Sequence, residues 1–158
     1  MNRVTVYSLL RWGLVIGWMV VIFLLSNESA DGSQARSDTI VELSRSLGLS
    51  GSAEVLSTAI RKSAHVVAYM VLGELVVWAL AGHRRVTLKV IGGSVIIAGL
   101  FAVSDEFHQS FVPGRSAEVR DVLIDTAGAT VGAGIVGYIS MRRQKNFTTS
   151  EKSAKISK

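Results

Sequence analysis

Four apolar segments, each close to the length needed to cross a lipid bilayer, constrain this chain more than any other feature. They cover roughly residues 8–26, 66–81, 86–104 and 122–141. A membrane-spanning helix needs about 20 mostly apolar residues, and it satisfies its own backbone hydrogen bonds in lipid. Glu74 and Asp125 make the second and fourth segments weaker candidates, because a charged group at membrane depth costs roughly 2.5–3.5 kcal/mol. We therefore predict an all-α fold, a four-helix transmembrane bundle.

The composition supports a membrane protein and excludes several other classes. Hydrophobic residues make up 49% of the 158 residues, and the mean hydropathy is +0.40, which is too apolar for an ordinary soluble domain of this length. The absence of cysteine excludes disulfides, thiolate catalysis and sulfur-ligated metals. The net charge of +5 does not indicate nucleic-acid binding, because no basic stripe is interleaved with aromatic residues.

Basic residues divide unevenly between the two sides of the predicted bundle. Eleven of the 17 Lys and Arg residues fall in the N-terminal segment, in the loop around His83-Arg84-Arg85 and in the C-terminal tail. Because such residues concentrate on the cytoplasmic side of membrane proteins, we expect both termini to be cytoplasmic. Residues 1–141 then form a membrane domain, and residues 142–158 form a basic cytoplasmic tail that we expect to be disordered.

The longest connection, residues 27–61, faces outward in this orientation. Its centre places Ile40, Leu43 and Leu47 at helical spacing with polar residues between them. We expect a short outer interfacial helix there. We also expect the first span to be retained rather than cleaved as a signal peptide, because the sequence that follows it is a poor cleavage site.

Polar and ionisable residues collect at the outward ends of the last three spans. Helical spacing puts three groups each on one helix face: Lys62, His65 and Tyr69; Asp105, His108 and Gln109; Asp121, Asp125, Gly128 and Gly132. Glu106 accompanies the second group, and the Pro113-Gly114 turn returns Arg115 over the site. Ionisable groups at membrane depth persist mainly where they pair, bind or react. We therefore predict that these residues form one outward-facing polar site.

The glycines of the last span indicate how its acidic residues point. Gly128-x-x-x-Gly132 is a small-residue pattern that lets helices pack closely in lipid. Asp121 and Asp125 share the face of these glycines, so we expect both carboxylates to point into the bundle.

Several other interpretations of the polar residues stay open. The cluster can be structural, a set of ion pairs that ties helix ends together. His65, Asp105, Glu106 and His108 offer nitrogen and oxygen ligands to a divalent metal, but no metal-binding signature is present. A serine hydrolase is disfavoured, because neither Ser63 nor Ser104 lies in a nucleophile elbow. Lone arginines at helix ends, such as Arg11, Arg61 and Arg120, are expected to reach the membrane interface.

The order of the motifs resembles that of the VanZ-like family of small bacterial integral membrane proteins. The matching stretches are Ile22–Ser26, Arg61–His65 with Tyr69 and Leu72, Ser104–Phe111, Val112–Arg115 and Asp121–Asp125 with Gly128. The resemblance covers roughly residues 22–138 and implies a multi-pass protein of the bacterial inner, or cytoplasmic, membrane. The family is named for teicoplanin resistance, but the resemblance implies no particular biochemical activity. Asp125 departs from the family, which favours asparagine at this position.

The residues and the resemblance together suggest a function at the cell envelope. Lys62, Arg115 and His65 suit an anionic group, and Asp105, Glu106 and Asp121 suit orienting or acid–base roles. We list Lys62, His65, Asp105, Glu106 and Asp121 as candidate catalytic residues, and Tyr69, His108, Gln109, Arg115 and Asp125 as candidate ligand-binding residues. The expected partners are membrane lipid, an anionic lipid or cell-wall precursor, a glycopeptide or lipopeptide antibiotic, or a second copy of the chain. We predict no cofactor. Whether the protein is an enzyme or a binding protein stays open.

Overall fold

The structure is a computed structural model that describes residues 2–26, 42, 46, 53–112 and 117–156. In the described part of the chain it contains four long helices and no strand: α1 (Arg3–Ser26), α3 (Ala53–Ala81), α4 (Leu88–Gln109) and α5 (Val119–Ile156). Each includes a stretch long and apolar enough to cross a membrane. The predicted all-α, four-span bundle is therefore confirmed. The expected outer interfacial helix lies outside the described residues.

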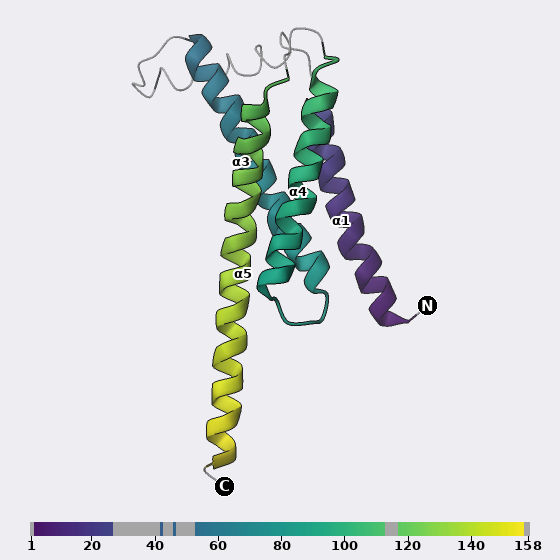
Figure 1. The fold of residues 1–158 in the computed structure, drawn as a ribbon, viewed down its shortest axis with the longest axis vertical. Coiled ribbons are helices and arrows are strands. Elements are labelled where there is room, and N and C mark those ends of the chain that lie inside the picture. The colour runs from purple at the N-terminus through teal and green to yellow at the C-terminus, as the bar shows by residue number, and fades with distance from the viewer. Residues whose placement is uncertain (1, 27–41, 43–45, 47–52, 113–116, 157–158) are drawn as a thin grey trace.

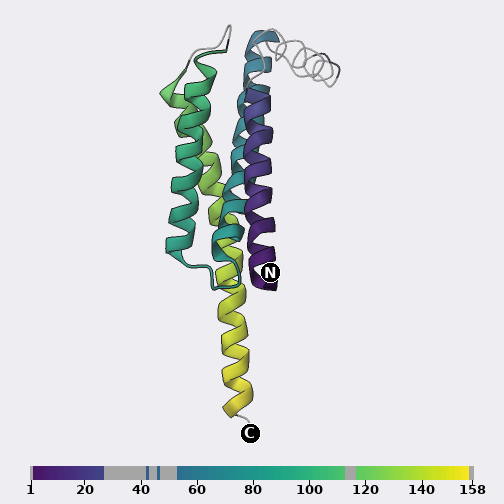
Figure 2. The ribbon, with the colours of Figure 1, turned by 90° about the vertical axis from the view of Figure 1, so that its right-hand side faces the viewer.

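The helices alternate in direction, and α3 lies at the centre of the bundle (Figure 1). It packs against all three other helices, most extensively against α5, while α1 contacts mainly α3. The two chain ends lie at the same end of the bundle, which we call the terminal end (Figures 1 and 2). The opposite end, where α1 and α4 finish and α5 begins, carries the buried carboxylates, and we call it the polar end.

The contact between α3 and α5 depends on glycine. A Cβ atom added at Gly128 would lie 2.7 Å from the carbonyl oxygen of Val66, and one added at Gly132 would overlap the carbonyl oxygen of Met70. From the other side, a Cβ atom at Gly73 would overlap the backbone of Ala129. Close backbone approach of this kind is the main source of helix association in lipid. The prediction that the Gly128–Gly132 face packs into the bundle is confirmed.

Polar contacts to backbone carbonyls join the remaining helices. The indole nitrogen of Trp18 on α1 donates to the carbonyl of Ala68 at 2.9 Å, and the hydroxyl of Ser94 on α4 donates to the carbonyl of Gly73 at 2.9 Å. Small and branched side chains fill the space between these contacts; the fully buried ones include Leu72, Val76, Ala98 and Ala129. Many large apolar side chains stay exposed on the outer faces, as expected for helices that contact lipid.

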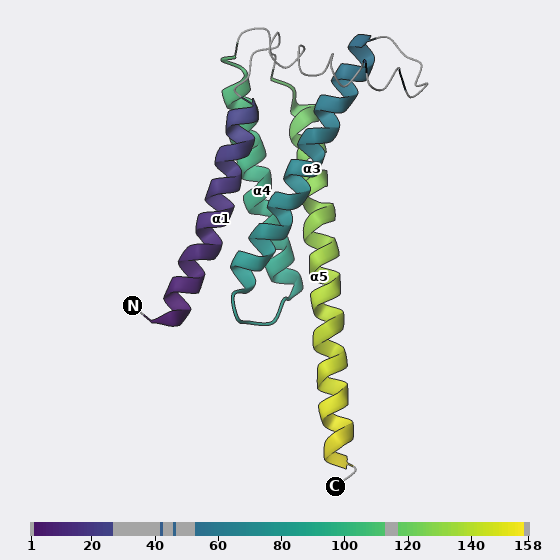
Figure 3. The ribbon, with the colours of Figure 1, turned by 180° about the vertical axis from the view of Figure 1, so that it is seen from behind.

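At the terminal end, α1 diverges from the pair formed by α3 and α4 (Figures 1 and 3). Only 11% of its apolar window is buried inside the protein, the lowest share among the four spans. The short loop between α3 and α4 begins at Gly82, whose φ of +58° is accessible to glycine at little cost. Thr87 then caps α4, because its hydroxyl accepts from the backbone N–H of Val90 at 3.4 Å.

The C-terminal helix differs from the sequence-based expectation. Disorder was expected from residue 142, but α5 continues to Ile156 and extends well beyond the other helices (Figure 1). The segment after Met141 contains neither glycine nor proline, and adding residues to an existing helix is far easier than starting a new one. The separation of the chain into a membrane domain and a basic tail stays a prediction.

Candidate functional site: a polar pocket between three helices

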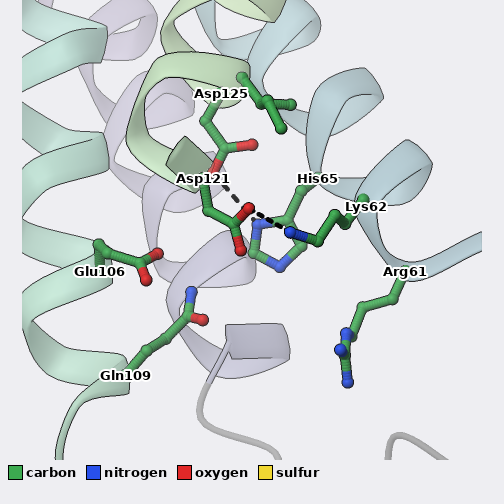
Figure 4. Close-up of a pocket in the computed structure, with 8 residues that line it drawn as sticks. Arg61, Lys62, His65, Glu106, Gln109, Asp121 and Asp125 are labelled. Atoms are coloured by element: carbon green, nitrogen blue, oxygen red, sulfur yellow. Dashed lines mark hydrogen bonds and ion pairs between the residues drawn. The ribbon is translucent and has the colours of Figure 1, made fainter. Parts of the chain in front are cut away.

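A small pocket opens at the polar end between α3, α4 and α5 (Figure 4). Its lining comprises Arg61, Lys62 and His65 of α3, Glu106 and Gln109 of α4, and Asp121, Ile124 and Asp125 of α5. The cavity measures about 30 Å³, so it admits a water-sized group. Seven of its eight lining residues carry polar side chains, although all three helices have the composition of membrane spans.

Lys62 provides the first link between α3 and α5. Its ammonium group pairs with the carboxylate of Asp121 and lies 3.7 Å from a carboxylate oxygen of Glu118. The side chains of Lys62 and Asp121 are 32% and 29% exposed, so solvent only partly screens the pair. Because two carboxylates already surround this ammonium group, its positive charge is largely compensated within the protein.

A histidine–aspartate pair forms the second link between the same helices. Nδ1 of His65 lies 3.4 Å from Oδ2 of Asp125, whose side chain is only 6% exposed. If the carboxylate is ionised and the imidazole is neutral, this contact places the ring proton on Nδ1, because an ionised carboxylate can only accept hydrogen bonds. The second ring nitrogen of His65 then carries a lone pair and points away from Asp125 toward the open part of the pocket (Figure 4).

A buried carboxylate on α4 lies behind the pocket. Oδ2 of Asp105 accepts from the hydroxyl of Ser26 at 2.8 Å, from Gln109 at 3.3 Å and from the hydroxyl of Tyr69 at 3.5 Å. These contacts join the end of α1 to α3 and α4. Oδ1 of Asp105 is buried and has no hydrogen-bond partner among the described residues. This oxygen can therefore accept a further hydrogen bond. Leaving it without one is costly, because a buried acceptor has lost its contacts with water.

Glu106 connects α4 to the start of α5. One of its carboxylate oxygens accepts from the backbone N–H of Glu118 at 2.6 Å, immediately before the first residue of α5. The first N–H groups of a helix have no partner within the helix, and a negative charge there also suits the helix dipole. Glu106 is only 6% exposed, so its carboxylate depends on this hydrogen bond rather than on hydration.

The structure brings together most, but not all, of the residues selected from the sequence. Lys62, His65, Glu106, Gln109, Asp121 and Asp125 line the pocket. Tyr69 and Asp105 lie deeper and contact each other. His108 faces α1 instead, with its ring centroid 4.2 Å from that of Phe23. Arg115 lies outside the described residues, so its expected position over the site stays a prediction.

Three participants were not selected from the sequence. Ser26 donates to Asp105, Glu118 joins the Lys62 pair, and Arg61 lines the pocket. Ser26 and Arg61 lie within the stretches that carry the family resemblance, but a serine at the end of an apolar run and single charged residues near helix ends are common, so their residue types did not single them out. No group of three or more histidine, aspartate or glutamate side chains in the described part of the chain is arranged to hold a metal ion.

These observations define a class of protein: a small helical membrane protein with four spans and a partly buried acid–base cluster at one end of the bundle. The sequence model of the VanZ/LLP1 family matches residues 11–140 of the chain. The chain therefore belongs to this family, which confirms the resemblance seen in its motifs. Comparison with curated proteins finds no match, and comparison with solved structures finds none either.

Proposed function

We propose that the polar pocket binds the head group of a cell-envelope lipid or lipid-linked wall precursor, and that His65 acts there as a general base. The observation that supports this most is the orientation of the His65 ring. Asp125 holds Nδ1, and the other ring nitrogen is left free toward the pocket (Figure 4). A base oriented by a carboxylate in this way is the arrangement that acid–base and nucleophilic catalysis repeatedly uses. The 3.4 Å contact is long, as such contacts often are without substrate.

The charges around the pocket indicate what kind of head group fits. Lys62 is compensated by Asp121 and Glu118, whereas Arg61 has no carboxylate partner among the described residues. A guanidinium group binds phosphate oxygens through two parallel hydrogen bonds. Asp125 and Glu106 are hydrogen-bond acceptors on the other side of the pocket, so they suit a hydroxyl or amine. A phosphate-bearing head group that also carries donor groups satisfies both sides.

The size of the pocket limits how such a ligand is held. A cavity of about 30 Å³ accepts one polar group rather than a whole head group. We infer that a single hydroxyl or amine enters between His65 and Gln109, and that the phosphate stays at the entrance near Arg61. Removal of a proton from that hydroxyl by His65 would make its oxygen the nucleophile in a group-transfer step.

A second candidate is a non-catalytic cluster that fixes the helix ends. It is supported by Glu106, whose carboxylate is already engaged by the start of α5, and by Lys62, which bridges α3 and α5. In this case, removing one partner of a partly buried pair leaves an uncompensated charge, which typically destabilises a protein by about 3–5 kcal/mol.

The distinguishing experiment compares His65→Gln and Arg61→Gln with the control Arg120→Gln, a change at an exposed arginine of α5. Folded yield, the lipid profile of the cells and their tolerance of glycopeptide or lipopeptide antibiotics are measured for each. We expect normal yield in all three, with the lipid change produced by the protein lost only in His65→Gln and Arg61→Gln. Lost yield for His65→Gln supports the structural cluster. Normal yield with an unchanged lipid profile and lost tolerance leaves a binding protein and removes the catalytic role.

A further inference from the structure

A second hollow lies at the terminal end of the bundle, far from the polar pocket. It is a groove of about 330 Å³ between α1 and the loop that joins α3 to α4. Its walls include Val4, Arg11 and Trp12 of α1, Leu80 of α3, and His83 and Arg84 of the loop. We call it the α1–loop groove. It forms where α1 diverges from the rest of the bundle (Figures 1 and 3).

Aromatic and cationic side chains cross between α1 and the other helices at this groove. The guanidinium carbon of Arg11 lies 5.0 Å from the ring centroid of Trp78 on α3, and the rings of Tyr7 and His83 meet edge to face at 6.1 Å. Arg11 therefore points from α1 toward the end of α3. Aromatic rings and arginines of this kind are concentrated at the level of lipid head groups.

No carboxylate in the described part of the chain compensates the positive charge of the groove. Among the described residues, neither Arg11 nor Arg84 forms an ion pair with a carboxylate, whereas Lys62 and His65 at the polar end do. The rest of the wall is largely apolar, through Val4, Trp12 and Leu80. A soluble anion would use the charge but leave this apolar surface unfilled. A molecule with a negative head and an aliphatic chain uses both.

We propose that the α1–loop groove binds an anionic phospholipid of the leaflet at the terminal end. Arg11 and Arg84 hold the phosphate, since guanidinium groups match phosphate oxygens, and an acyl chain lies along Val4, Trp12 and Leu80. Basic pockets between membrane helices bind such head groups when they lie at the membrane surface. This site is separate from the polar pocket and has no part in the function proposed for it.

The test uses the full chain purified in a neutral detergent and titrated with phosphatidylglycerol or with phosphatidylcholine of the same acyl chains. Bound lipid is counted by native mass spectrometry. The variants are Arg11→Gln and Arg84→Gln, and the control is Arg85→Gln, an equal loss of charge at an exposed neighbour that does not line the groove. We expect the wild-type chain to prefer phosphatidylglycerol. Each groove variant should bind it about fivefold more weakly, corresponding to the ~1 kcal/mol of one basic residue at a membrane surface.

Several results would overturn the proposal. Equal affinity for the two lipids would show that the groove does not recognise the charge of the head group. An equal loss of phosphatidylglycerol affinity in Arg85→Gln would show that all basic residues attract the lipid without a specific site. Displacement of the lipid by inorganic phosphate would identify a site for free anions. Arg84 is exposed on the loop, so Arg84→Gln should leave the fold intact. It therefore tests the phosphate contact even if Arg11→Gln reduces folding. His65→Gln should keep the lipid preference, because it changes only the polar pocket.

Discussion

One of the close contacts between α3 and α5 leads to a prediction about a single methyl group. Gly128→Ala adds a Cβ atom 2.7 Å from the carbonyl oxygen of Val66, where ordinary contacts begin at 3.4 Å. The backbones of α3 and α5 must therefore separate locally by about 0.7 Å, the difference between these two distances. Gly134 lies on the same helix with nothing within 4 Å of its added Cβ, so Gly134→Ala makes the same chemical change without the collision.

The difference between the two variants isolates the cost of the collision. In both variants the helix gains up to about 1 kcal/mol of stability, because alanine favours the helical conformation more than glycine does. Gly128→Ala also forces atoms into a packed interface, which typically costs about 1–3 kcal/mol. Loss of close van der Waals contact between the helices adds to this cost, because no hydrophobic effect holds helices together in lipid. We expect Gly128→Ala to be less stable than Gly134→Ala by about 1–3 kcal/mol.

Reversible unfolding of the purified protein in mixed detergent micelles measures this difference. Gly128→Leu extends the series, and we expect it to prevent folding, whereas Val131→Leu should be tolerated because Val131 is 51% exposed. Equal unfolding free energies for Gly128→Ala and Gly134→Ala would refute the argument. They would mean that the Gly128 face is free to shift, or that it does not form the contact with α3.

Three further predictions concern the polar end and the topology. Glu106→Ala removes the acceptor at the start of α5 and should cost about 0.5–2 kcal/mol in the same unfolding assay; Glu106→Gln keeps an acceptor oxygen and should cost less, and equal costs would contradict a capping role. Ser26→Ala removes a donor 2.8 Å from a buried carboxylate and should cost about 1 kcal/mol, whereas Ser63→Ala at an exposed position should cost nothing measurable. A reporter that is active only outside the membrane should be silent after Lys158 and active when inserted near Gly48; the reverse pattern would invert the orientation.

Hydropathy was sufficient to predict the number and type of the helices, but not their ends. The third span was expected to leave the membrane near residue 104, and α4 indeed continues past Asp105 to Gln109 as the expected outward extension. At the other extreme, α5 continues to Ile156 through a polar sequence. Hydropathy detects where a helix meets lipid, whereas the helix itself ends only where backbone hydrogen bonds are interrupted.

Helical spacing located most of the pocket, and its one clear miss has a geometric cause. Residues 108 and 109 are one position apart, so they differ by about 100° around the helix axis. Gln109 therefore reaches Asp105 and the pocket, while His108 reaches Phe23 on α1. The spacing alone cannot say on which side of Asp105 the neighbouring helix lies. Helical spacing did not single out Ser26 either, because its role depends on where α1 meets α4.

Because the polar contacts between α3 and α5 join residues far apart in the sequence, they can form only after the last helix has been made. α1 has the highest hydropathy of the four spans and little buried surface, so it can enter the bilayer alone as an anchor. α3 follows with Lys62 and His65, whose partners Asp121 and Asp125 are made 59 and 60 residues later. A chain interrupted before α5 therefore leaves these groups, and the backbone of α3 at Val66 and Met70, uncovered. An unfinished chain therefore differs from a complete one in the charge and backbone that it exposes until α5 is in place.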